Sequence, residues 1–173
     1  MVIEPQFEEV RAFSEGLAAI KMRVSEYSSL WGYIDKTGKV VIEPKFYGVQ
    51  RFSEGLAAVR LDSKWGFIDK SGSLIIPDKF VGPENYYGDG VEPFSGGLAM
   101  VRMGEKAGFI DKTGRFVIQP QFINATSFEE GLARVNVGGR WVREVNIGGG
   151  DTQPEVSAKF EGGKWGYVSS MPQ

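Results

Sequence analysis

The chain has 173 residues and a net charge of −2, so it lacks the basic excess that is typical of nucleic-acid-binding proteins. Hydrophobic residues make up 42% and charged residues 24%, which is ordinary for a globular domain with a substantial core. The sequence contains neither His nor Cys, which excludes disulfides, a His-based catalytic triad and metal sites built from these two residue types.

The first predicted element covers residues 17–22, Leu-Ala-Ala-Ile-Lys-Met. Ala18 and Ile20 fall on one face and Lys21 on the other, which predicts an antiparallel strand with one face in water. The same pattern returns three times, at 56–61, 98–103 and 132–137.

The next element, Trp-Gly-Tyr-Ile-Asp at 31–35, is apolar on both faces, as is Val-Val-Ile at 40–42. Such strands are expected between two layers of structure. Asp-Lys-Thr-Gly at 35–38 predicts a tight turn between them, because Asp accepts backbone N–H bonds and Gly adopts positive φ. The glycine inside the Trp-Gly strand predicts that a neighbouring ring or backbone packs closely against it.

The elements repeat along the chain as one predicted domain, residues 1–173, of about four units. The units are 31–64, 65–106, 107–164, and a last one formed by 165–170 together with 1–30. Ala107 stands where the other copies have Trp, and we expect a neighbour to fill the vacated volume. In the last unit, 132–142 and 156–166 each predict a separate hairpin, joined by a loop at 146–155.

The recurring motif is Trp-Gly-aromatic-Ile-Asp-x-x-Gly followed by Phe-x-Glu-Gly-Leu-Ala-x-Val. It resembles the WG (KWG) repeat family, found mainly in bacterial proteins, and the resemblance covers almost the whole chain. It implies a β-rich repeat module that is usually a binding or scaffolding element, and it implies no single activity.

The predicted fold class is therefore all-β, with about four WG-type repeats of antiparallel β-meander. Because the two chain ends complete each other as one unit, we expect a closed propeller-like or barrel-like array rather than an open β-rod. In that array residues 2–4 pair with residues 165–169.

Most polar residues of the motif have a structural explanation. Asp35, Asp69 and Asp111 are interpreted as caps of their own turns rather than as a carboxylate site, and Lys36, Lys70 and Lys112 as solvated turn tips. The basic positions Lys21, Arg60, Arg102 and Arg134 form an anion-binding stripe only if the strands stack in register. The Gly-rich segment 148–153 lacks the following helix of a phosphate-binding loop.

The insertion at 81–93 breaks the repeat and is the candidate ligand-binding site. Paired tyrosines beside an amide and acids suit a polar ligand such as a glycan or peptide. The candidate binding residues are Glu84, Asn85, Tyr86, Tyr87 and Asp89.

Three functions stay open. The first is a non-enzymatic binding or scaffolding module for a protein or a polar polymer. The second is a carboxylate-dependent carbohydrate-active enzyme that uses Glu84, Asp89 and Glu92. The third is a purely architectural repeat of a larger protein. We expect no metal, cofactor, nucleic acid or membrane span, and the absence of a signal-peptide pattern predicts a cytoplasmic location.

Overall fold

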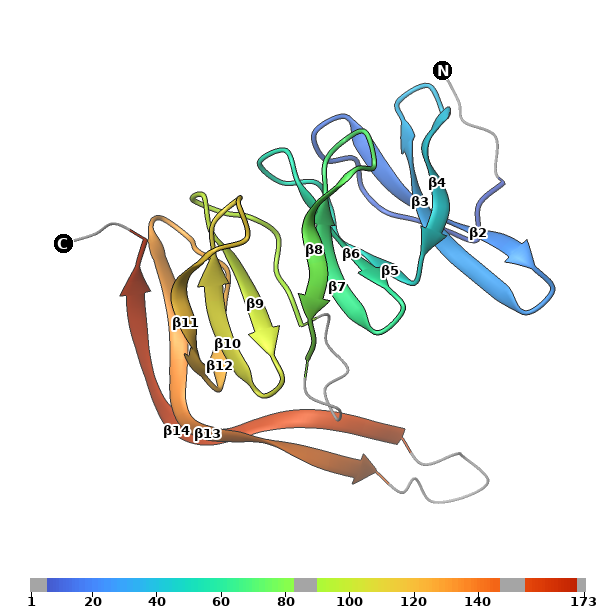
Figure 1. Ribbon diagram of the computed structural model, residues 1–173. Coiled ribbons are helices and arrows are strands. Elements are labelled where there is room, and N and C mark those ends of the chain that lie inside the picture. The colour runs from blue at the N-terminus through green and yellow to red at the C-terminus, as the bar shows by residue number, and fades with distance from the viewer. Residues whose placement is uncertain (1–5, 83–89, 147–154, 171–173) are drawn as a thin grey trace.

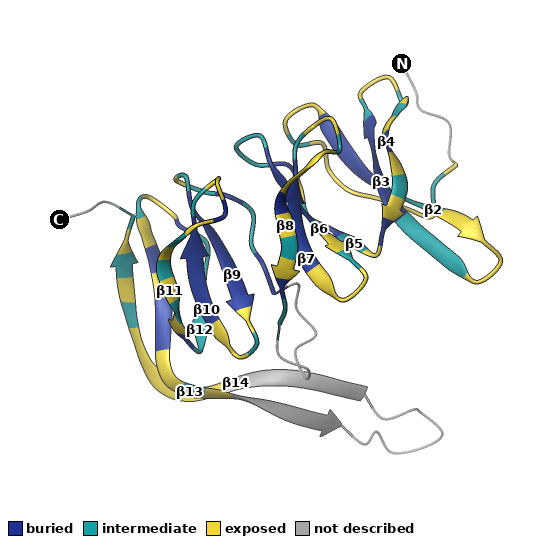
Figure 2. Cartoon of the chain, viewed as in Figure 1, coloured by how far each residue is buried: buried dark blue, intermediate teal, exposed yellow. Residues whose placement is uncertain are grey.

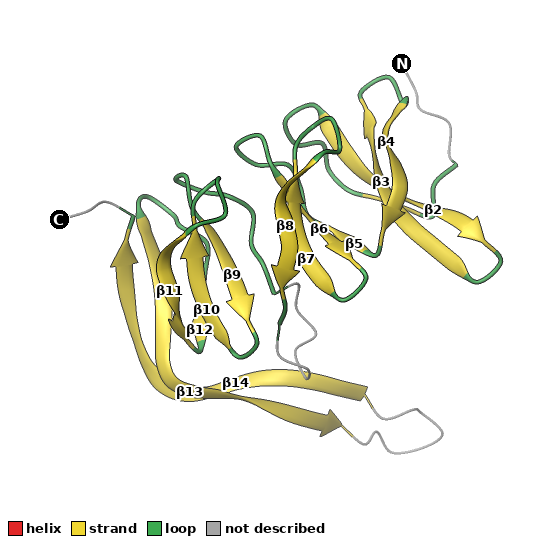
Figure 3. Cartoon of the chain, in the orientation of Figure 1, coloured by secondary structure: helices red, strands yellow, loops and turns green. Residues whose placement is uncertain are grey.

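The computed structural model describes residues 6–82, 90–146 and 155–170, and of residues 141–146 and 155–160 the backbone alone. The regular secondary structure in these ranges consists of β-strands alone. They form four antiparallel sheets that follow one another in a row (Figures 1 and 3). The expectation of an all-β repeat protein is confirmed.

Each sheet is built from consecutive strands. The first sheet has the order β1-β2-β3-β4, with β1 at Glu9–Val10, β2 at Leu17–Ser25, β3 at Ser28–Asp35 and β4 at Val40–Phe46. The second has the order β5-β6-β7-β8, with β5 at Gly48–Val49, β6 at Ala57–Leu61, β7 at Lys64–Ile68 and β8 at Leu74–Phe80. The third has the order β11-β10-β9, with β9 at Ala99–Met103, β10 at Lys106–Ile110 and β11 at Phe116–Phe122. The fourth has the order β12-β13-β14, with β12 at Asn124–Ala125, β13 at Leu132–Asn146 and β14 at Glu155–Ser169.

The predicted three-stranded meander is present in each of the first three sheets. The connection between repeats adds a short strand that the sequence pattern did not predict. In the second sheet this strand is β5, whose Val49 pairs with Val59 of β6. The connection then inserts an aromatic side chain into the core, Phe52 in the first of these interfaces.

The core lies between successive sheets. In the first interface, Tyr33 and Ile42 of the first sheet pack with Ala57, Val59 and Ile68 of the second. The same arrangement joins the second sheet to the third, and the third to the fourth. Each inner sheet therefore buries one face against the sheet before it and the other against the sheet after it (Figure 2).

Two expectations about strand faces are wrong because of this stacking. The first strand of the meander was expected to have one face in water, yet Ala58 and its equivalents Ala19 and Met100 are buried. The third strand was expected to be apolar and covered on both faces, yet Val41 and Ile75 are exposed. The third strand is the edge of its sheet, and Val41 and Ile75 alternate with the buried Ile42 and Ile76, so only one face of this strand is covered.

The expected closed array is not found, since neither a barrel nor a propeller forms in the described residues. The first and fourth sheets lie at opposite ends of the row (Figure 1). Trp165 to Ser169 pair with β13, from Asn136 to Leu132. Residues 2–4, their expected partners, lie outside the described range. The physical reason is that each sheet stacks on the face of the next one, which carries the two ends apart instead of bringing them together.

The two hairpins expected in the last unit are also wrong. β13 and β14 instead form one long two-stranded ribbon, paired from Leu132 opposite Ser169 to Asn146 opposite Glu155. The Gly-Gly pairs at 138–139 and 162–163 do not make turns. They lie opposite each other in the ribbon, with Gly139 paired to Gly162, where Figure 1 shows it bending.

The Asp-Lys-Thr-Gly turns form as expected. One carboxylate oxygen of Asp35 accepts hydrogen bonds from the Thr37 hydroxyl at 2.6 Å, the Thr37 N–H at 2.8 Å and the Lys39 N–H at 3.1 Å. Asp69 and Asp111 repeat this arrangement with the following turn residues. The Asp residues therefore cap their own turns.

Acid is expected to weaken these three turns. The hydroxyl hydrogen bond is the largest cause that lowers the pKa of Asp35, Asp69 and Asp111 below the ordinary value. A pKa that is lowered in the folded state gives stability that is complete above the unfolded-state pKa and is lost as the pH falls through the folded value. The urea midpoint should therefore fall as the pH drops below about 4, the ordinary pKa of Asp, and more steeply than in the triple Asp→Asn variant, whose amides do not titrate. Parallel pH curves for the two proteins would contradict this assignment.

The Ser-Glu-Gly segments hold neighbouring repeats together. Ser14 and Ser53 donate their hydroxyls to the carbonyls of Phe52 and Phe94 in the next repeat, at 2.6 and 2.7 Å. Glu15 accepts the N–H of Gly55 and pairs with Lys70 at 3.1 Å, and Glu54 likewise accepts from Gly97 and pairs with Lys112 at 3.1 Å. Lys70 and Lys112 are thus partners of the preceding repeat, whereas solvated turn tips were expected.

Ala107 is buried, and the expectation that a neighbour fills the missing indole volume agrees with this. Its cross-strand partner is Arg102, which is fully buried and donates to the carbonyl of Ile123 at 3.1 Å and to Asn124 at 3.3 Å. Because Arg102 is buried while Arg60 is exposed, the four basic positions do not form a surface stripe.

Candidate binding site

The outer face of the fourth sheet exposes side chains whose equivalents are buried in every other sheet. Tyr167 of β14 is 68% exposed, although Tyr33, Phe67 and Phe109 at the same position are buried. Leu132 of β13 is 47% exposed, whereas its equivalents Leu17, Leu56 and Leu98 are buried. In the described part of the chain, no further sheet covers this face.

Arg134 lies on the same face, where the earlier sheets carry Ala19, Ala58 or Met100. Its guanidinium stands 6.0 Å from the ring centre of Trp165, a cation–π contact between β13 and β14. The face therefore combines two aromatic rings and an aliphatic side chain with one positive charge.

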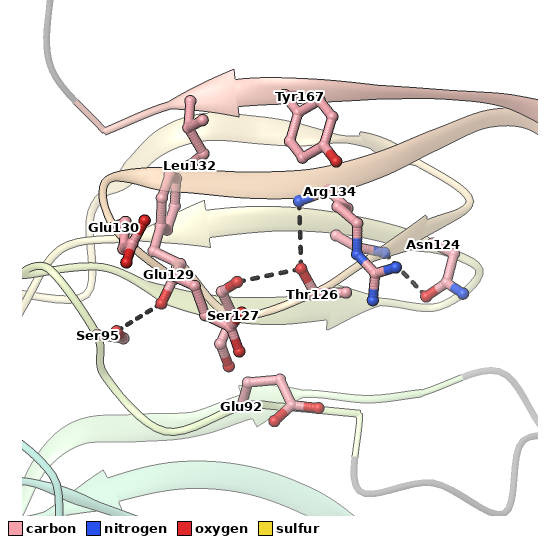
Figure 4. Close-up of a pocket in the computed structure, with 12 residues that line it drawn as sticks. Glu92, Ser95, Asn124, Thr126, Ser127, Glu129, Glu130, Leu132, Arg134 and Tyr167 are labelled. Carbon is pink, nitrogen blue, oxygen red and sulfur yellow. Dashed lines mark hydrogen bonds between the residues drawn. The ribbon is translucent and has the colours of Figure 1, made fainter.

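This face borders an open groove with a volume of about 1110 Å³. The groove also includes the connection that precedes β13 and the connection of the third repeat (Figure 4). Its lining residues are Glu92, Ser95, Asn124, Ala125, Thr126, Ser127, Phe128, Glu129, Glu130, Leu132, Arg134 and Tyr167.

Hydrogen bonds hold the polar wall of the groove in place. The Thr126 hydroxyl accepts from the Arg134 N–H at 3.2 Å and donates to the Ser127 carbonyl at 3.1 Å. Ser95 donates to the carbonyl of Phe128 at 2.6 Å. Because these bonds use backbone groups of the connection, they fix its course beside Tyr167.

Glu130 has a left-handed backbone conformation at the rim of the groove, with φ of 51°. Glu15 and Glu54, which bind the next repeat, have φ values of 52° and 53°. This conformation is uncommon for a residue with a side chain and signals a structural or functional constraint. Glu130 thus has the backbone geometry of the two carboxylates that join repeats.

The candidate residues in the insertion fall outside the described residues. This applies to Glu84, Asn85, Tyr86, Tyr87 and Asp89. Glu92, the third acid of the enzyme hypothesis, lines the groove at the third repeat, where Glu129 and Glu130 also contribute carboxylates.

The sequence interpretation missed Leu132 and Tyr167 and treated Arg134 only as part of the basic stripe. The available signal was the comparison of equivalent positions, because Arg134 replaces an apolar residue only in the last copy. Among the described residues, no group of three or more acidic side chains is arranged to hold a metal ion. That part of the chain also has no helix with the length and apolar character of a membrane span.

Comparison with protein families gives a match to the family described as WG containing repeat. The matched segments are residues 1–23, 31–65, 65–80, 89–106 and 108–141, most of the chain. No curated protein and no solved structure matches.

Proposed function

Since the chain belongs to the WG containing repeat family, we propose that it is a non-enzymatic binding or scaffolding module that recognises another protein through the groove of its fourth sheet. One observation carries the proposal: Tyr167 and Leu132 are exposed at positions that face a neighbouring sheet everywhere else in the molecule. An exposed apolar face with polar residues at its rim is typical of a protein interaction site.

The chemistry of the groove favours a protein over a small molecule. The groove is open and mixes apolar side chains with the carboxylates of Glu129 and Glu130 and the guanidinium of Arg134. Small-molecule pockets usually enclose most of the ligand between apolar walls, whereas a large open surface suits a macromolecule. Tyr and Arg are also the residues that most often dominate the binding free energy of protein interfaces.

The proposal is tested by capture experiments with the purified chain, accompanied by a glycan array for polar polymers. Tyr167→Asp places a charge in the apolar face, and Tyr27→Asp is the matched control, since Tyr27 is 90% exposed in the turn between β2 and β3 of the first sheet. We expect protein capture by the wild type and by the Tyr27 variant, and loss of capture by the Tyr167 variant. Capture that is insensitive to Tyr167→Asp, or binding to glycans alone, would exclude the groove as a protein site.

A further inference from the structure

We propose that the protein partner of the fourth sheet is the first sheet of a second copy of this chain, so that copies associate head to tail. This inference rests on the proposed function and names its partner. The two ends of the row carry complementary halves of the interface that already joins the repeats within the chain.

The aromatic contact of that interface occurs three times. Tyr33 packs on Phe52 with ring centres 4.9 Å apart, Phe67 on Phe94 at 5.1 Å, and Phe109 on Phe128 at 4.9 Å. In each pair the first ring belongs to one sheet and the second to the connection of the next repeat. Among the described residues, the positions without such a partner are Tyr167 at one end and Phe13 at the other, and Phe13 is 43% exposed.

The aliphatic contacts follow the same logic. Val10 of β1 is 65% exposed, although Val49 and Val91 at the equivalent position are buried against the preceding sheet. Leu132 at the opposite end is exposed where Leu17 and Leu56 are buried. A first sheet placed on a fourth sheet covers Val10, Phe13, Leu132 and Tyr167 together, which removes apolar surface from water on both copies.

The ion pairs give the proposed interface its charge complementarity. Glu15 and Glu54 each bind the turn lysine of the next repeat, Lys70 and Lys112 respectively. Glu130 is the third such carboxylate, and Lys36 is the third such lysine, in the turn of the first sheet. The carboxylate of Glu130 from one copy and the ammonium of Lys36 from the next therefore form the equivalent pair.

The third repeat shows that this carboxylate is present only where it has a partner. Gly96 replaces the glutamate there, and the fourth sheet that follows ends in Val168-Ser169-Ser170, without the turn lysine. Within the chain, the glutamate and the lysine of an interface are thus present together or absent together. Glu130 and Lys36 are the two members left, and they lie at opposite ends of the row.

The edge of the fourth sheet offers a second, independent observation. Gly66 and Gly108 are covered by the neighbouring third strand, so that an added Cβ would lie 2.7 and 2.6 Å from the carbonyl oxygens of Ile76 and Ile118. Gly166 of β14 has no such neighbour within 4 Å. Residues 2–7, Val-Ile-Glu-Pro-Gln-Phe, repeat the third-strand sequence Val-Ile-Glu-Pro-Lys-Phe of 41–46. Among the described residues, the edge of β14 at Gly166 is therefore uncovered and can accept a further strand.

The interface is heterologous, because the surface at one end differs from the surface at the other. Each added copy presents a new free fourth sheet, so association continues beyond a dimer unless the copies close into a ring. The association is therefore expected to depend on protein concentration and to give a series of species rather than one dimer.

Charge variants at the two ends test the direction of association in sedimentation velocity experiments. Glu130→Lys places two lysines opposite each other, and Lys36→Glu places two glutamates opposite each other. Each variant alone should associate about tenfold more weakly than the wild type, since like charges across an interface are unfavourable. An equimolar mixture should associate as the wild type does, because every junction then pairs Lys with Glu. Both side chains are exposed, and thermal melts verify that each variant is folded.

Three results would overturn the inference. The first is a wild-type chain that stays monomeric up to its solubility limit. The second is association that Lys36→Glu leaves unchanged, as expected if two fourth sheets pair with each other. The third is a mixture that associates no better than its components. A chain that stays monomeric but still captures a different protein through Tyr167 refutes the self-association alone. A chain that neither self-associates nor captures a protein through Tyr167 refutes the proposed function as well.

Discussion

Replacing Trp65 with alanine is expected to lower the free energy of unfolding by about 3–5 kcal/mol, the usual range for removal of a buried large aromatic side chain. The indole is 5% exposed and belongs to the core between the second and third sheets, together with Phe67 and Ile76. Its ring also lies against Gly48, where an added Cβ would be 3.1 Å from the indole. These contacts leave little space for the surroundings to collapse into the cavity.

The matched control is Trp165→Ala, at the equivalent position of the fourth sheet. Trp165 is 52% exposed, so its removal leaves no enclosed cavity, and we expect a loss of about 1 kcal/mol or less. Urea denaturation of both variants at low protein concentration measures the difference. Equal losses of unfolding free energy at the two positions would mean that Trp65 does not stabilise the protein through its burial between stacked sheets.

The stacked arrangement explains why these two tryptophans should differ so much. A repeat array is stabilised by the interfaces between neighbouring units, because no single unit encloses a core of its own. Trp65 lies inside such an interface and Trp165 lies on the last sheet of the row. The same sequence motif therefore has a structural role in the interior and becomes an interaction surface at the end.

Much of the repeat could be predicted from the sequence because its local chemistry is strong. The strand 31–35 and the turn capped by Asp35 follow from hydrophobic pattern and turn residues alone. The close neighbour expected for the glycine of the Trp-Gly pair is found in the backbone of the third strand. The error at Ala58 has a physical cause, since a small apolar side chain next to Arg60 gives the alternation of a strand with one polar face. Its burial depends on a neighbouring sheet that the pattern does not contain.

The long ribbon could not be predicted from local rules. Residues 138–139 and 162–163 carry the Gly pairs of tight turns, so two local hairpins satisfy the pattern equally well. The observed pairing of β13 with β14 joins residues from Leu132 to Ser169 in one register, which is a long-range choice. The complementary chain ends likewise suggested closure, because a sequence pattern does not distinguish pairing within a copy from pairing between copies.

The candidate groove was missed for a related reason. The insertion at 81–93 is predicted as the site because it breaks the repeat, whereas Tyr167 and Leu132 follow the repeat pattern and so carry no signal of a site in the sequence. Their exposure depends on position in the row rather than on residue type. Only Arg134, a charge at an otherwise apolar position, distinguishes the outer face of the fourth sheet in the sequence itself.

Gly66→Ala is expected to be strongly destabilising, with a loss of about 1–3 kcal/mol from overpacking. An added Cβ would lie 2.7 Å from the carbonyl oxygen of Ile76 and 2.9 Å from the backbone nitrogen of Asp78, so β7 and β8 would have to separate. Gly166→Ala is the matched control, since nothing lies within 4 Å of its added Cβ. In the dilute monomer it should be neutral or stabilising by up to about 1 kcal/mol, because alanine loses less backbone entropy on folding.

The same pair of variants also bears on head-to-tail association, because a strand arriving beside β14 would meet the methyl group of Ala at position 166. Gly166→Ala should therefore weaken association in sedimentation velocity while it leaves the thermal melt of the dilute chain unchanged or raises it. Gly66→Ala should lower the melting temperature. If Gly166→Ala instead destabilises the dilute monomer as much as Gly66→Ala does, the edge of β14 is already covered within one copy, and the proposed strand addition has no place to occur.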